Sequence, residues 1–132
     1  MTLPLISAVY AGLLALLMLA LAVRVVLRRR GAGIGIGTGQ DRELERRVRV
    51  HGNAVEYVPL ALIVLVLAEM LGLAAWAVNL CGAALLIGRL LHAWGFSHSA
   101  GTSPGRAVGM LLTWLVTAGL ALWLVFRGSG LY

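Results

Sequence analysis

Six polar residues lie within otherwise apolar stretches of the chain, and their side chains are the ones able to do chemistry: Arg49, Asn53, Glu56, Asn79, Arg89 and His92. A charged side chain near the centre of a membrane-spanning helix costs about 2.5–3.5 kcal/mol on insertion scales. Such residues therefore usually face a partner or a cavity. Their presence predicts either an ion pair that holds helices together or a polar site.

Three of these residues share one face of a predicted helix. Arg49, Asn53 and Glu56 occupy positions i, i+4 and i+7, so at about 100° per residue they lie within roughly 60° of one another. Pro59 follows on the same helix. It removes one backbone donor and predicts a kink or a local polar opening beside this face.

The next predicted helix carries a second polar face, formed by Arg89 and His92 and ending at Phe96. Counting inward from the helix ends at 1.5 Å per residue puts Glu56 and Arg89 about 10 Å deep, and Asn53 and His92 about 6 Å deep. Since the two helices are antiparallel neighbours, we expect a buried Glu56–Arg89 ion pair, with Asn53 and His92 completing a polar lining. A pair that only locks the helices together is the alternative.

Arg106 lies near the start of a further predicted helix, for which Ser103 is the N-cap and Pro104 the first residue. Unpaired N–H groups and a guanidinium make this helix start a candidate anion site. The alternative is an arginine that reaches the membrane surface and sets topology. His92 is the one histidine clearly within a hydrophobic run, so we expect no metal or two-histidine haem site.

Four hydrophobic runs position these residues. Of the 132 residues 61% are hydrophobic and 12% charged, and the mean hydropathy is +0.94, which excludes a disordered chain and argues against an ordinary soluble domain. The fold class is therefore all-α: a polytopic membrane protein with a single domain over residues 1–132, built as an antiparallel bundle of four transmembrane helices. The expected spans are residues 3–27, 48–71, 73–96 and 104–126.

The positive charge indicates membrane topology rather than a nucleic-acid partner. All 11 basic residues are Arg, and eight of them lie between Arg24 and Arg49, beside hydrophobic runs. The positive-inside rule then places both longer loops in the cytoplasm and both termini outside. Within the first loop, residues 31–39 are glycine-rich and read as a flexible linker. Glu69, at the outer end of the second run, reads as an interfacial residue.

Two stretches of the sequence resemble the MAPEG family, the membrane-associated proteins in eicosanoid and glutathione metabolism. Residues 49–59, RVHGNAVEYVP, resemble the family signature, and residues 88–96, GRLLHAWGF, followed by Arg106 and Gly109, are similar to bacterial members. The string HGNAVEY is most like an uncharacterised bacterial inner-membrane branch of the family. The resemblance implies a four-helix bundle in that membrane, assembled as a homotrimer.

The resemblance also implies a co-substrate. Glutathione would bind between neighbouring subunits near the cytoplasmic face. In characterised members, residues that match Arg49, Asn53, Glu56 and Tyr57 help to hold it. An arginine at the start of the fourth helix, for which Arg106 is the nearest match, stabilises its thiolate. A free thiol has a pKa of about 8.5, and a nearby guanidinium favours the thiolate. Arg106 is thus the expected catalytic residue.

Together these features predict glutathione-dependent transfer or peroxidase chemistry on a lipophilic small molecule that reaches the site from the lipid bilayer. Arg89 and His92 complete the expected binding residues, although eicosanoid-type members carry Tyr where this chain has His92 and Phe96, so two hydroxyl contacts are missing. One alternative is a non-catalytic membrane scaffold of the same fold. The other, a small four-span exporter, needs a glutamate in the first span, and residues 3–27 contain no acidic residue.

Overall fold

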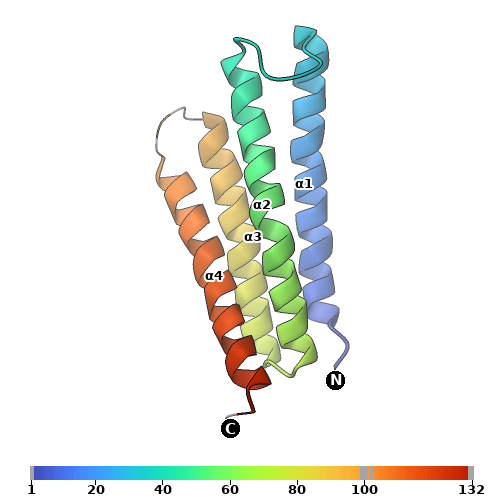
Figure 1. Ribbon diagram of the computed structural model, residues 1–132, viewed down its shortest axis with the longest axis vertical. Coiled ribbons are helices and arrows are strands. Elements are labelled where there is room, and N and C mark those ends of the chain that lie inside the picture. The colour runs from blue at the N-terminus through green and yellow to red at the C-terminus, as the bar shows by residue number, and fades with distance from the viewer. Residues whose placement is uncertain (1, 99–100, 102, 131–132) are drawn as a thin grey trace.

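The computed structural model describes residues 2–98, 101 and 103–130. Four helices, each long and apolar enough to cross a membrane, run side by side in alternating directions (Figure 1). Both termini and the α2–α3 turn lie at one end of the bundle, here called the terminal end, and the other two connections lie at the opposite end, the loop end (Figure 1). The predicted all-α four-helix bundle is confirmed. The helices are α1 (Leu5–Ala32), α2 (Arg42–Met70), α3 (Ala75–His98) and α4 (Pro104–Gly128).

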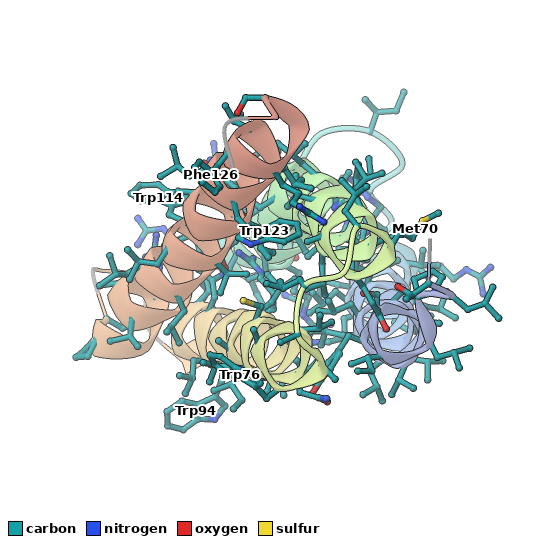
Figure 2. All side chains as sticks on the ribbon, turned by 90° about the horizontal axis from the view of Figure 1, so that it is seen from below. Met70, Trp76, Trp94, Trp114, Trp123 and Phe126 are labelled. Carbon is teal, nitrogen blue, oxygen red and sulfur yellow. The ribbon has the colours of Figure 1, made fainter. Side chains whose placement is uncertain are left out.

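Helices α2 and α3 form the middle of the bundle. Helix α2 packs against each of the other three helices, while α1 also contacts α3 and α3 contacts α4. Seen from the terminal end, α1 lies to one side of the α2–α3 pair and α4 lies to the other (Figure 2). The buried face of α2 includes Val50, Ala54, Val58, Ala61 and Leu65. Large apolar side chains such as Trp94 and Trp114 project outward instead, as expected for a surface that contacts lipid.

Glycines bring α3 and α4 together near the loop end. A Cβ atom built on Gly109 would lie 2.3 Å from the carbonyl oxygen of Gly88, and one on Gly95 would lie 2.7 Å from Ser103 Oγ. A Cβ atom on Gly105 would lie 3.0 Å from the Leu91 carbonyl oxygen. Such close backbone approach is typical of helix contacts in membranes. It places the first turns of α4 directly against the last turns of α3.

The glycine-rich connection at the loop end is held at both sides. Helix α1 continues into it as far as Ala32, and Gly33 ends the helix in the left-handed region with a φ of 67°. At the other side, Asp41 caps α2 by accepting hydrogen bonds from the backbone N–H groups of Glu43 and Leu44. Arg28 of α1 donates through Nε to Asp41 Oδ2 at 2.8 Å. The linker therefore covers residues 33–41 rather than the expected 31–39, and an ion pair ties its far end to α1.

This ion pair predicts a pH dependence of stability. The hydrogen bond from Arg28, followed by the backbone N–H of Leu44, lowers the pKa of the Asp41 carboxyl. A lowered pKa in the folded state stabilises the fold fully above the ordinary value of about 3.9, and that contribution is lost as the pH falls through the lower folded value. Asp41→Asn keeps a capping side chain but removes the charge, so its unfolding temperature should fall less than that of the parent chain between about pH 6 and pH 3.

The matched control is Glu45→Gln, because Glu45 is exposed and forms no ion pair within the described residues. Its unfolding temperature should follow the same pH curve as the parent chain. An Asp41→Asn curve parallel to both would contradict a stabilising role for the Arg28–Asp41 pair.

At the terminal end, Glu69 is a buried cap rather than the interfacial residue that the sequence suggests. The residue is 7% exposed, and its carboxylate accepts hydrogen bonds from the backbone N–H groups of Ile6 and Ser7 and from Ser7 Oγ. Helix α1 has no side-chain cap of its own at Pro4, so the carboxylate from α2 satisfies its free N–H groups. This contact fixes the start of α1 against the end of α2.

Candidate functional site

Arg89 is the most deeply buried charged residue of the predicted site, with 2% of its surface exposed. Its Nη2 atom donates to Asn53 Oδ1 on α2 at 2.6 Å. Its Nη1 atom lies 3.6 Å from the sulfur of Met110 on α4. Its Nε atom is buried with no hydrogen-bond partner among the described residues. The guanidinium of Arg89 thus links three helices from inside the bundle.

The predicted Glu56–Arg89 ion pair is wrong for the single chain. Glu56 is exposed, and no ion pair among the described residues includes it. The error lies in rotation about the axis of α2. At about 100° per residue, Glu56 points roughly 160° away from the mean direction of the buried face of α2, whereas Asn53 lies about 100° away, on the side of the helix. Asn53 can therefore reach Arg89, and Glu56 faces outward.

His92 lies one turn beyond Arg89 on α3 and is 3% exposed. Its Nδ1 atom lies 3.3 Å from Arg89 Nη2. Because a guanidinium can only donate, Nδ1 accepts, and a neutral imidazole then carries its hydrogen on Nε2. The His92 ring also packs on Phe96, with 5.6 Å between ring centroids. The orientation of His92 is thereby fixed by Arg89 on the side of the terminal end and by Phe96 on the side of the loop end.

Arg106 is held over an aromatic ring at the loop end. Its Cζ atom lies 3.8 Å from the centroid of the Phe96 ring, a cation–π contact. Its Nη1 atom donates to the Gly101 carbonyl oxygen at 2.6 Å. As predicted, Ser103 is the N-cap of α4 and Pro104 is its first residue. Phe96, which the sequence analysis treated as a missing hydroxyl, therefore supports the guanidinium of Arg106.

Two adjoining chambers lie between α2, α3 and α4 at this end, and both are bordered by Arg49, Phe96 and Arg106. The inner chamber has a volume of about 360 Å³. Its other lining residues are Asn53, His92, Ser103, Ala107 and Met110. The outer chamber has a volume of about 520 Å³. Its other lining residues are Arg42, Glu45 and Arg46.

The structure thus brings together four of the seven predicted site residues: Arg49, Asn53, His92 and Arg106 line the inner chamber. Arg89 lies next to the inner chamber, on the side of the terminal end, and contacts Asn53 and His92. Glu56 and Tyr57 are outside both chambers. Tyr57 is half-buried between α2 and α4, where the centroid of its ring lies 6.4 Å from that of the Trp114 ring.

Arg42 and Arg46 were not predicted as site residues, because they were counted only among the eight arginines that indicate membrane topology. Their signal was available, because Arg42, Arg46, Arg49 and Asn53 follow one another at spacings of three or four residues. That spacing continues the polar face of α2 toward its N-terminus. The predicted polar face instead began at Arg49, because the expected membrane span begins at residue 48.

The comparison with known proteins agrees with this architecture. The sequence model of the MAPEG family matches residues 7–126. The chain is 42% identical over 110 residues to a protein named inner membrane protein YecN from Escherichia coli strain K12, an alignment that covers 83% of this chain and 82% of that protein. The protein of the same name from Escherichia coli O6:H1 gives the same identity and coverage. The predicted family resemblance is confirmed, and the relatives' name agrees with four apolar helices in an inner membrane.

Proposed function

This chain belongs to the MAPEG family of membrane proteins, and from that premise we propose that it is a glutathione-dependent transferase or peroxidase acting on lipophilic electrophiles. The observation that carries the proposal is the inner chamber. Arg49 and Arg106 border it from two helices, and Asn53 and His92 line it. It joins cationic groups suited to a peptide's carboxylates with a guanidinium suited to a thiolate.

Each polar side chain of the chamber has a distinct task in this proposal. Asn53 Oδ1 is occupied by Arg89, so the Asn53 amide N–H groups are left to donate to a carboxylate of glutathione. Arg89 is then a positioning residue. Arg106 favours the ionised sulfur, and the thiolate attacks the electrophilic atom of the second substrate while that atom's leaving group departs. Met110 supplies apolar surface for that substrate.

The outward position of Glu56 supports a site that is completed by another copy of the chain. A carboxylate facing lipid about 10 Å below the membrane surface would cost roughly 2–3 kcal/mol or more. A second subunit that covers this face of α2 removes that cost and brings Glu56 and Tyr57 to the edge of a shared site. We therefore propose the homotrimer typical of the family, with the loop end and its arginines on the cytoplasmic side.

Glutathione should raise the unfolding temperature of the protein in detergent, because a ligand that binds only the folded state stabilises it by mass action. At a concentration of about 100 times the dissociation constant, the gain is about 2.7 kcal/mol. Arg106→Ala should lose most of this gain, since it removes the charged partner of the thiolate. The measurement is a thermal unfolding series against glutathione concentration, combined with conjugation of a chloroarene as the activity readout.

Arg30→Ala is the matched control, because Arg30 is exposed at the same end of the bundle and lines neither chamber. It should respond to glutathione as the parent chain does. If neither the parent nor any variant is stabilised, the glutathione proposal is overturned and a non-catalytic scaffold with the same fold becomes the better account.

A further inference from the structure

We propose that the outer chamber is a binding site for a phosphate group that carries two or more negative charges, as in a phosphomonoester or a diphosphate. The site shares Arg49 and Arg106 with the proposed glutathione site and adds Arg42, Glu45 and Arg46, which line the outer chamber but not the inner one. It is built by the first turns of α2, which continue past the ends of α3 and α4 at the loop end (Figure 1). Arg42, Arg46 and Arg49 all lie in the first eight residues of α2.

The three arginines of α2 converge because of their spacing. Positions 42, 46 and 49 are related as i, i+4 and i+7, so their side chains leave α2 on one face. Arg106 meets them from α4, where Phe96 and the Gly101 carbonyl oxygen hold its guanidinium in place. Four guanidinium groups from two helices therefore border one cavity of about 520 Å³, a volume within the usual range for small-molecule sites.

The charge of the chamber is not balanced by the protein. Glu45 is the acidic residue that lines it, which leaves a net charge of about +3 when each arginine counts +1. Two other arginines at the loop end are neutralised locally, since Arg28 pairs with Asp41 and Arg47 pairs with Glu43. No hydrogen bond or ion pair joins Arg42 or Arg46 to another described side chain. The unbalanced charge indicates an anionic ligand.

A multiply charged phosphate suits this arrangement best. A guanidinium presents paired N–H donors that match phosphate oxygens, and a phosphomonoester carries about −1.5 to −2 charges at pH 7. A diphosphate carries more and would neutralise the chamber more fully. Either group can belong to a lipid of the adjacent leaflet or to a molecule free in solution, and the recognition chemistry is the same.

Binding of inorganic pyrophosphate to the detergent-solubilised protein, measured by calorimetry in the absence of any thiol, tests the site. The parent chain should bind, and binding should weaken as salt is added. Arg46→Gln should weaken it about tenfold, the effect expected when a charged hydrogen-bond donor is lost. Arg42→Gln with Arg46→Gln should reduce it by about a hundredfold. Arg30→Gln removes the same charge at the same end of the bundle and should change the affinity by less than about twofold.

Glu45→Gln provides a test of opposite sign. Removing the carboxylate from the chamber should tighten pyrophosphate binding by about threefold or more. Each substituted side chain is exposed or half-buried at the loop end. The helix content and the unfolding temperature of each variant without ligand should therefore match those of the parent chain. Absence of pyrophosphate binding by the parent chain, or an equal loss in Arg30→Gln, would overturn the proposal.

Nanodiscs distinguish the two sources of the phosphate. In phosphatidylcholine discs, adding phosphatidic acid (a phosphomonoester) should compete with pyrophosphate, whereas phosphatidylglycerol (a singly charged phosphodiester) at equal content should compete at least about threefold less. That pattern assigns the site to a lipid headgroup. Pyrophosphate binding without competition by phosphatidic acid assigns it to a soluble phosphate. Equal competition by both lipids would contradict selectivity for a doubly charged phosphate.

Discussion

Gly109→Ala is expected to destabilise the protein by at least about 1–3 kcal/mol, the usual range for inserting a methyl group into a packed interior. The new Cβ atom would lie 2.3 Å from the Gly88 carbonyl oxygen and 2.8 Å from the Cβ atom and the backbone nitrogen of His92. Two of these three atoms belong to the backbone, so α3 and α4 must separate to make room. Unfolding in mixed detergent micelles, followed by helix content, measures the change.

Separation of these helices should also weaken glutathione binding, because it moves Arg106 away from Phe96. The matched control is Gly119→Ala on the same helix, where a Cβ atom would meet nothing within 4 Å. Alanine is the better helix former by about 1 kcal/mol, so this control should be neutral or stabilising. Equal effects of the two substitutions would contradict the close α3–α4 contact.

Asn53→Ala is expected to destabilise the protein by about 1.5–3 kcal/mol, the range for a hydrogen bond to a charged group. The reason is that Arg89 is 2% exposed and donates to Asn53 Oδ1 at 2.6 Å. Loss of the amide would leave a buried guanidinium with one fewer acceptor, while its Nε atom already has no partner among the described residues.

A double-mutant cycle separates this contact from the ion pair that the sequence suggested. Asn53→Ala combined with Arg89→Met should show a coupling of about 1–3 kcal/mol. Glu56→Gln combined with Arg89→Met should show a coupling within about 0.5 kcal/mol of zero, because the two side chains do not meet within a chain. A large coupling between Glu56 and Arg89 would indicate that the two side chains do form an ion pair, and it would contradict the outward direction of Glu56.

The fold was predictable because apolar runs of the length of a membrane span leave few alternatives. The helix ends were less so. Helix α1 continues to Ala32 and α2 begins at Arg42, outside the apolar runs, because exposed arginine, glutamate and alanine are good helix formers in water as well. Hydrophobicity marks where a helix meets lipid, and the cap at Asp41 marks where α2 begins.

The levels of Asn53 and His92 along their helices were predicted correctly, but the rotation of α2 was not. Asn53 and His92 line one chamber, as the count along the helices indicated. The direction of Glu56 was wrong because a face of about 60° cannot be assigned to the bundle interior until the neighbouring apolar positions are known. Here Ala54 and Val58 occupy the interior. The buried cap made by Glu69 was not predictable either, because it depends on which helix start lies beside it.

The α3–α4 contact was only partly predictable from the sequence. The glycines at 88, 95, 105 and 109 are visible in the sequence, but small residues are frequent throughout so apolar a chain. Only the structure shows that glycines of α3 face glycines and backbone carbonyl groups of α4 so closely that an added Cβ atom would clash. This contact, more than any single polar residue, sets the distance between Arg106 and the residues of α2 and α3.

The central claim is that the inner chamber binds glutathione and holds its sulfur ionised beside Arg106. An ultraviolet difference spectrum of glutathione with the purified protein at about pH 7 tests this most directly, because a free thiol with a pKa of about 8.5 is mostly protonated there. We predict a thiolate absorption band with the parent chain and with Arg30→Ala, and no band with Arg106→Ala or with S-methylglutathione. Glutathione that binds without a thiolate band, or an undiminished band in Arg106→Ala, would contradict the account.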